Sequence, residues 1–122
     1  MIEELKKEVI DLFNEYEITL IDIQKRNTNQ SGDYLSLLSY SKNPIFIDLF
    51  FTITVVETSL DKTPILFERV EKINSVLEQS LLHISNSQVI EIGTISIEDN
   101  TTESSYFLAT INFTWRKVLN GI

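Results

Sequence analysis

The chain has 122 residues, of which 43% are hydrophobic and 23% are charged, as in an ordinary globular domain. It contains no cysteine, which excludes disulfides and thiolate metal sites. Its net charge of −8 argues against binding to nucleic acid through the phosphates, which requires clustered basic residues. The N-terminal segment lacks the apolar region of a secretory signal, and the apolar stretch 45–56 is too short to span a bilayer. We therefore expect a single domain over residues 1–122 that does not contact a membrane.

The first predicted element is an amphipathic helix over Ile2–Tyr16. Its apolar residues recur at steps of three and four, which places them on one stripe (Ile2, Leu5, Val9, Leu12, Phe13 and Tyr16). A short strand is predicted next, over Ile18–Ile23, because branched side chains favour extended backbone. The segment Lys25–Asp33 is rich in Asn, Ser and Gly, so we interpret it as a loop.

Two strands are predicted over Tyr34–Tyr40 and Ile45–Thr58, with a turn at Ser41–Pro44 between them. The second strand has one face that holds only apolar side chains (Ile45, Ile47, Leu49, Phe51, Ile53 and Val55). Its other face mixes polar residues with Phe46 and Phe50. A reverse face of this kind indicates a cover on both sides of the strand, the second being either a helix or another subunit.

A longer helix is predicted over Pro64–His83, after a linker at Ser59–Thr63. Thr63 suits the N-cap position and Pro64 the first position of the helix. The apolar residues of this segment again recur at steps of three and four (Leu66, Val70, Ile73, Leu77, Leu81 and Ile84). So short a stripe is more typical of a helix packed on a sheet than of a coiled coil.

Two further strands, over Val89–Ile97 and Tyr106–Leu119, are predicted to form a hairpin with a polar, acidic tip. The second strand has an apolar face (Phe107, Ala109, Ile111, Phe113 and Trp115) and a mostly polar one. Gly93, in the first strand, indicates a bulge or a close approach of the backbone. The predicted fold is α+β, with two helices and a mainly antiparallel sheet of about five strands, in the order α-β-β-β-α-β-β.

No group of residues has the spacing of a catalytic or metal site. The single histidine, His83, has no second ligand at metal spacing, and it ends a predicted helix, where a histidine commonly contacts the last carbonyls. Asp22 and Asp48 are carboxylates in apolar strands, but alternation predicts that they point outward or meet a partner at the strand end. A glycine-rich phosphate loop and a nucleophile elbow are both missing. We therefore expect no enzymatic activity, no metal and no cofactor.

Four aromatic residues are candidates for a subunit interface: Tyr34, Tyr40, Phe46 and Phe50. They lie on the two neighbouring strands, and aromatic side chains are enriched at protein interfaces. The alternative interpretation is a second layer of core beneath a helix. An open sheet also leaves edges that must be protected, and contact between subunits is one way to protect them.

The order of the predicted elements carries a family resemblance. A helix opens the chain, Pro44 introduces an apolar strand, a long helix follows directly, and a final hairpin with an acidic tip ends in Phe107–Trp115. In this order the chain resembles the tail terminator proteins of long-tailed bacteriophages, which complete the tail and join it to the head. Members of that family are similar in size and acidity. The segment Lys25–Asp33 does not match the pattern of the family.

The resemblance implies a structural virion protein that is assembled in the cytoplasm of the bacterial host. Family members form a homo-oligomeric ring, commonly a hexamer, which caps the tail tube, stops its polymerisation and provides the surface for the head. The implied partners are the tail tube protein and the head-completion protein, and DNA passes through the lumen without specific binding. Glu98, Asp99 and Glu103 at the hairpin tip would then face the lumen or a partner, because such a group of carboxylates is costly to bury.

A second interpretation is a small acidic secretion chaperone or adaptor that binds a partner protein as a dimer. The dimeric chaperones of type III secretion are also acidic and also run helix, three strands, helix, two strands. They normally finish with a third helix, whereas the last element predicted here is a strand. A generic interaction module of a mobile element is the third interpretation. The first two differ in mass in solution, since one forms a ring and the other a dimer.

Overall fold

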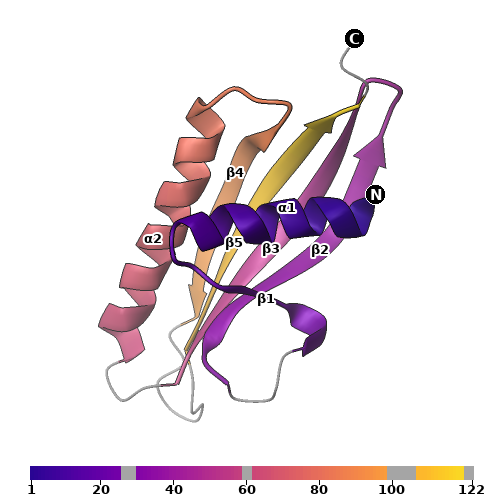
Figure 1. The fold of residues 1–122 in the computed structure, drawn as a ribbon. Helices are drawn as coiled ribbons and strands as arrows, with labels where there is room; N and C mark the ends of the chain where they lie inside the picture. Colours follow the sequence, from indigo (N-terminus) through magenta and orange to yellow (C-terminus); the bar gives the residue numbers. More distant parts are fainter. Residues whose placement is uncertain (26–29, 59–61, 99–106, 120–122) are drawn as a thin grey trace.

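The computed structural model describes residues 1–25, 30–58, 62–98 and 107–119, which form two helices and one five-stranded sheet (Figure 1). The elements in chain order are α1 (Ile2–Glu15), β1 (Leu20–Asp22), the 3₁₀ helix η1 (Ile23–Lys25), β2 (Gly32–Lys42), β3 (Phe46–Glu57), α2 (Lys62–Leu82), β4 (Ser87–Glu98) and β5 (Phe107–Val118). The predicted α+β class and the order α-β-β-β-α-β-β are confirmed.

The strands lie in the order β1-β2-β3-β5-β4. β1 runs parallel to β2, and every other neighbouring pair is antiparallel. β1 pairs only with Asp33–Leu35, so among the described residues the rest of β2 pairs with β3 alone and has no strand on its outer side. β4 forms the opposite edge of the sheet. The sheet therefore ends in two different edges, one short and covered by a helix, the other twelve residues long.

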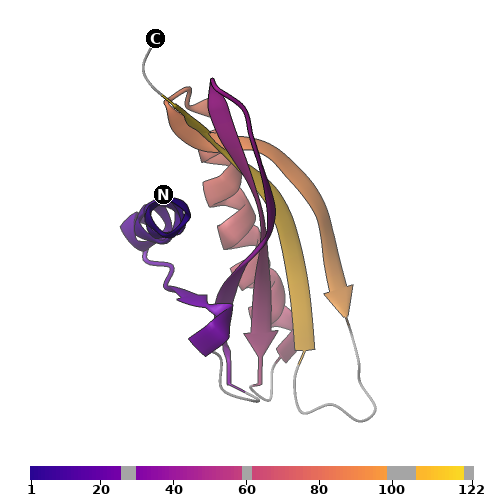
Figure 2. The same ribbon diagram turned by 90° about the vertical axis from the view of Figure 1, so that its right-hand side faces the viewer.

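Both helices lie on the same face of the sheet (Figures 1 and 2). α1 crosses over the strands and α2 runs along them. The buried side chains of both helices form one core with a single face of β3, which is the apolar face predicted from the alternation (Ile47, Leu49, Phe51, Ile53 and Val55). Phe51 stacks on Phe113 of β5 with 5.4 Å between the ring centroids. The predicted apolar face of the last strand is likewise buried or half-buried against the helices.

The predicted start of the second helix was wrong by two residues. α2 begins at Lys62, so Thr63 lies inside the helix and is not the N-cap. Pro64 remains in the first turn, where the missing amide hydrogen removes no intrahelical bond.

The predicted apolar stripe of α2 is correct up to Leu77 and wrong beyond it. Leu81 is 38% exposed and Ile84 is 91% exposed. In the last turn the stripe shifts by one residue: Ser80 faces the sheet, and its hydroxyl accepts the backbone N–H of Val89 at 3.1 Å. Ile84 lies past the end of the helix at Leu82, so the helical period no longer determines its direction.

Three register shifts interrupt the sheet, and the first lies in β4 between Val89 and Glu91. β4 changes register between Ile92 and Ile95, and a Cβ added to Gly93 would lie 3.3 Å from the Cβ of Asn112, which confirms the predicted bulge or close approach at this glycine. β2 has a bulge at Leu38, since Leu37 pairs with Phe51 and Ser39 with the adjacent Phe50. A bulge turns the following side chains to the opposite face of the strand.

Candidate functional site: the open face and the edges of the sheet

The face of the sheet opposite the two helices is covered by neither of them (Figure 2). On β3 this face carries the alternate residues from Phe46 to Val56, and on β5 it carries those from Leu108 to Val118. Hydroxyl and amide groups are common there, and the Thr52 hydroxyl donates to the side-chain oxygen Oδ1 of Asn112 at 2.5 Å. No helix of the described residues covers this face, so a cover by another subunit stays a prediction.

The basic side chain of Arg116, on the open face, is held by Asp48 and Phe46. Arg116 donates from Nε and Nη2 to the two carboxylate oxygens of Asp48, at 2.7 and 2.9 Å. Its guanidinium carbon lies 3.7 Å from the centroid of the Phe46 ring, a distance that permits a cation–π contact. The bond to Asp48 raises the pKa of Arg116. Asp48 points away from the core, as predicted, and the pair leaves this end of the face without net charge.

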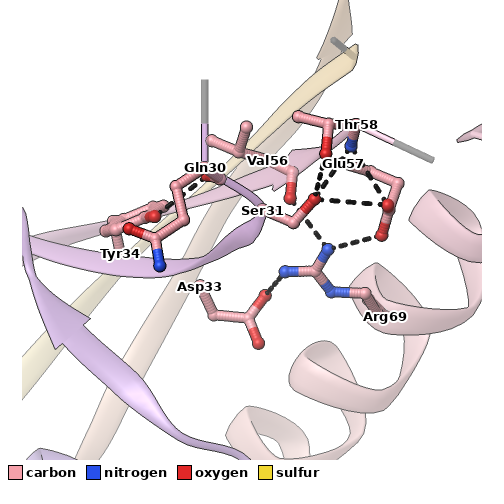
Figure 3. A network of polar contacts seen from close by, with 8 residues as sticks. All are labelled: Gln30, Ser31, Asp33, Tyr34, Val56, Glu57, Thr58 and Arg69. Carbon is pink, nitrogen blue, oxygen red and sulfur yellow. Dashed lines mark hydrogen bonds and ion pairs between the residues drawn. The ribbon is translucent and has the colours of Figure 1, made fainter. Parts of the chain in front are cut away.

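The four aromatic residues predicted as a subunit interface do not share one surface. Phe46 is half-buried and Phe50 is 36% exposed, both on the open face. Tyr34 is fully buried within the protomer, and its hydroxyl donates to the Gln30 carbonyl oxygen at 2.9 Å (Figure 3). Tyr40 pairs with Leu49 and so belongs to the helix-covered face, where it is 55% exposed.

The bulge in β2 explains this separation. In a regular strand Tyr34 and Tyr40 would share a face, because they are an even number of residues apart. The extra residue, Leu38, reverses the alternation after it and is itself 65% exposed. Leu38 lines a shallow groove with Phe50 and Gly93 on the open face, which sequence reasoning did not find.

The predicted acidic tip is only partly within the described residues. Glu98 is the last residue of β4 and is exposed. Asp99 and Glu103 lie outside the described residues. The proposed orientation of these three carboxylates therefore stays a prediction.

A buried ionic network fixes α2 to β2 and β3 (Figure 3). Arg69 of α2 donates from Nη1 to Glu57 Oε2 and to the Val56 carbonyl oxygen, each at 2.9 Å, and from Nη2 to Asp33. The side chains of Arg69, Asp33 and Glu57 are 22, 15 and 9% exposed. The hydroxyl of Ser31 joins the network through Glu57 and Thr58. One guanidinium thus satisfies two carboxylates from neighbouring strands.

The electrostatics of this network indicate a structural role. Burial raises the pKa of Asp33, and the charge and hydrogen bond of Arg69 oppose this shift. Sequence reasoning missed the network, although two signals were present. Strict alternation places Glu57 on the same face as Val55, and the helical period places Arg69 beside Leu66 and Val70. An acid on an apolar face together with a base beside an apolar stripe predicts a buried ion pair.

A second polar network joins α1 to β4 and β5 on the helix-covered face, at the opposite end of the strands from the Arg69 network. Ser87 Oγ donates to Glu8 Oε2 at 2.5 Å and accepts the Trp115 indole N–H at 2.8 Å. Lys117 donates to the other oxygen of Glu8 at 3.3 Å. His83 borders a cleft close to this network, together with Tyr16 and Trp115. Within the described part of the chain, no three histidine, cysteine or acidic side chains are arranged to hold a metal ion.

No protein-family model matches the sequence, and no curated protein matches it either. None of the described helices has the length and hydrophobicity needed to cross a membrane. The observations define an acidic α+β domain with one covered sheet face, one open face and two unlike edges.

Proposed function

We propose that this chain is a structural virion protein of the phage tail terminator type. In this proposal it forms a ring, most simply a hexamer, that caps the tail tube, stops its polymerisation and provides the surface that joins the head. The observation that supports the proposal is the arrangement of the sheet: both helices lie on one face, which leaves the other face and two unlike edges for neighbouring molecules.

Two unlike edges suit a ring. A closed cyclic ring is built from head-to-tail contacts, in which each protomer presents two different surfaces. In this chain β1 is three residues long and lies against α1, whereas β4 is twelve residues long. A dimer, in contrast, is usually built from one surface that meets its own copy.

The charge of the chain agrees with passage of DNA through the ring. The net charge is −8, and the Arg116 side chain on the open face is neutralised by Asp48. Such a surface offers little attraction to phosphates and so would not retain DNA. In the proposal the chain contacts the tail tube protein and the head-completion protein, and the carboxylates of Glu98, Asp99 and Glu103 face the lumen or one of these partners.

The proposal is tested by polymerising the tail tube protein from the phage that encodes this chain, with and without the chain present. We expect tubes to stop growing once the chain has bound, because the cap blocks the end to which subunits add. Tube length is measured by electron microscopy, with another acidic protein of similar size as the control. If tubes elongate as fast with a saturating concentration of this protein as they do without it, the proposal is wrong.

The alternative is an acidic chaperone or adaptor that binds a partner protein as a dimer. The observation that favours it is the groove on the open face, where Leu38 and Phe50 expose apolar surface that a partner segment could cover. The two functions predict different masses for the assembled protein.

A further inference from the structure

We propose that copies of this chain join head to tail through their sheets. The β4 edge of one copy adds, in the antiparallel direction, to the β1 edge of the next copy. Ile95 and Ile97 of β4 then enter the groove between α1 and β1 of that neighbour. This inference rests on the proposed ring and names the contact that would build it.

The β4 edge is apolar in the part of the strand that α2 does not cover. Ile95 and Ile97 pair with Ile111 and Ala109 of β5, so their side chains lie on the helix-covered face of the sheet. They are nevertheless 37 and 43% exposed. A long edge strand with exposed apolar side chains is a template for pairing with another strand, and proteins normally protect such an edge.

The opposite edge of the sheet has a groove that can receive these side chains. The groove lies where α1 passes over β1, and it is lined by three apolar side chains, two lysines and two acidic residues (Ile10, Leu20, Ile21, Lys6, Lys7, Glu3 and Asp22). Lys6 donates to Asp22 at 2.9 Å, which holds α1 against β1. Because α1 lies on the helix-covered face, the groove opens on the same side of the sheet as Ile95 and Ile97.

The charges of β4 disfavour its pairing with a second copy of itself. β4 contains two glutamates, Glu91 and Glu98, and no basic residue. At the groove, Lys7 is exposed and forms no ion pair with any described residue. Glu91 and Glu98 pair with Thr114 and Leu108 of β5, so they lie on the open face and do not meet this lysine. Their like charges disfavour only the pairing of β4 with a second β4.

The strand directions also fit. β1 and β2 run in one direction, and the antiparallel pairings make β3 run opposite, β5 with β2, and β4 opposite again. If a second copy is placed beside the first in the same orientation, its β1 is therefore antiparallel to β4. The antiparallel alternation of strand directions then continues from one copy to the next.

The two edges lie at the same height along the sheet. The registers connect Leu20 across the sheet to Ile97 by way of Asp33, Val55 and Ala109. In the same way they place Ile21 level with Ser96 and Asp22 level with Ile95. Pairing the edges therefore needs no shift along the strands, and contacts without a shift can close into a ring instead of forming a helical filament.

A pair of cysteines tests this register directly, because the chain has no cysteine of its own. Ile21→Cys and Ser96→Cys are introduced in separate proteins, which are mixed at high concentration and oxidised. Residues directly opposite each other in antiparallel strands are close enough for a disulfide. We expect a cross-linked heterodimer in the mixture, and a ladder of multimers when one chain carries both substitutions. In the control mixture Ile84→Cys replaces Ile21→Cys. Ile84 is 91% exposed and precedes the start of β4 at Ser87, the opposite end of that strand from Ser96.

A second variant tests the apolar part of the contact. Ile97→Asp should weaken self-association by about tenfold or more, as expected when a charge enters an apolar contact. Ile84→Asp is the matched control and should leave association unchanged. Both sites are exposed in the protomer, so the two variants should melt close to the parent, which a thermal scan checks.

The outcomes separate this inference from the proposed function. If the mixture of the Ile21→Cys and Ser96→Cys proteins cross-links no more than the control mixture, the inference is wrong. If the same preparation still caps tubes, the proposed function is unaffected. A strong heterodimer whose association Ile97→Asp weakens supports the inference, even if the chain does not stop tube growth and the proposed function fails.

Discussion

Replacing Ile73 by Asp is expected to lower the free energy of unfolding by about 4 kcal/mol, since a charge would be placed in an apolar core without a partner. Ile73 lies on the sheet-facing side of α2 and is 1% exposed. Its neighbours on the buried stripe, Leu66 and Leu77, are also buried and offer no polar group that could compensate for the carboxylate. Equilibrium unfolding in urea, followed by circular dichroism, measures the change.

Ser75→Asp is the control for this experiment. Ser75 lies on the exposed side of the same helix, so its replacement adds the same charge without burying it. We expect a change within about 0.5 kcal/mol. If the Ile73→Asp protein unfolded at the same urea concentration as the parent, the assignment of this helix face to the core would be wrong.

Replacing Arg69 by Met is expected to cost about 3 kcal/mol, because the change removes the cation and leaves two largely buried carboxylates beside each other. Asp33 and Glu57 both bind Arg69, and their side chains are 15 and 9% exposed. The change also removes the bond to the Val56 carbonyl oxygen and with it the link between α2 and the end of β3. Lys72→Met, one turn away at an exposed site, removes the same charge and should change stability little.

A second variant, Asp33→Asn, tests the contribution of the Asp33 carboxylate to the same network. Burial raises the pKa of Asp33, so its ionised form is the one that folding disfavours. In the parent, ionisation of Asp33 therefore reduces stability as the pH rises through its raised pKa. The amide oxygen of asparagine can still accept from Arg69, so this variant should fold stably and lose that part of the pH dependence. An Arg69→Met protein as stable as the parent would show that the network contributes nothing to the fold.

The sequence predicted the architecture because the architecture follows from periodicity. The alternation from Ile47 to Val55 identifies one buried face, and the steps of three and four in both helices identify the faces that cover it. Since every element showed the pattern of its own structure, the class and order of elements could be predicted without any tertiary information. The ends of elements were less accurate. β1 is shorter than predicted, because the Asp22 carboxylate accepts the N–H of Gln24 and the chain turns into η1.

The surfaces were harder to predict than the core. A single bulge at Leu38 moved Tyr40 to the opposite face, and no residue type in β2 marks that bulge. Tyr34 faces away from the main core but is fully buried, which a rule of alternation cannot foresee. The apolar edge at Ile95 and Ile97 becomes visible only when the strand order is known, because the sequence does not say which strand lies at the edge.

We propose that this chain works as a closed ring on a tail tube. Native mass spectrometry of the protein, alone at high concentration and after incubation with purified tubes of its own phage, measures the assembly directly. We expect a closed oligomer in at least one of these conditions, most simply with the mass of six chains of 14.1 kDa each. Dimers alone in both conditions would contradict it and would favour the chaperone.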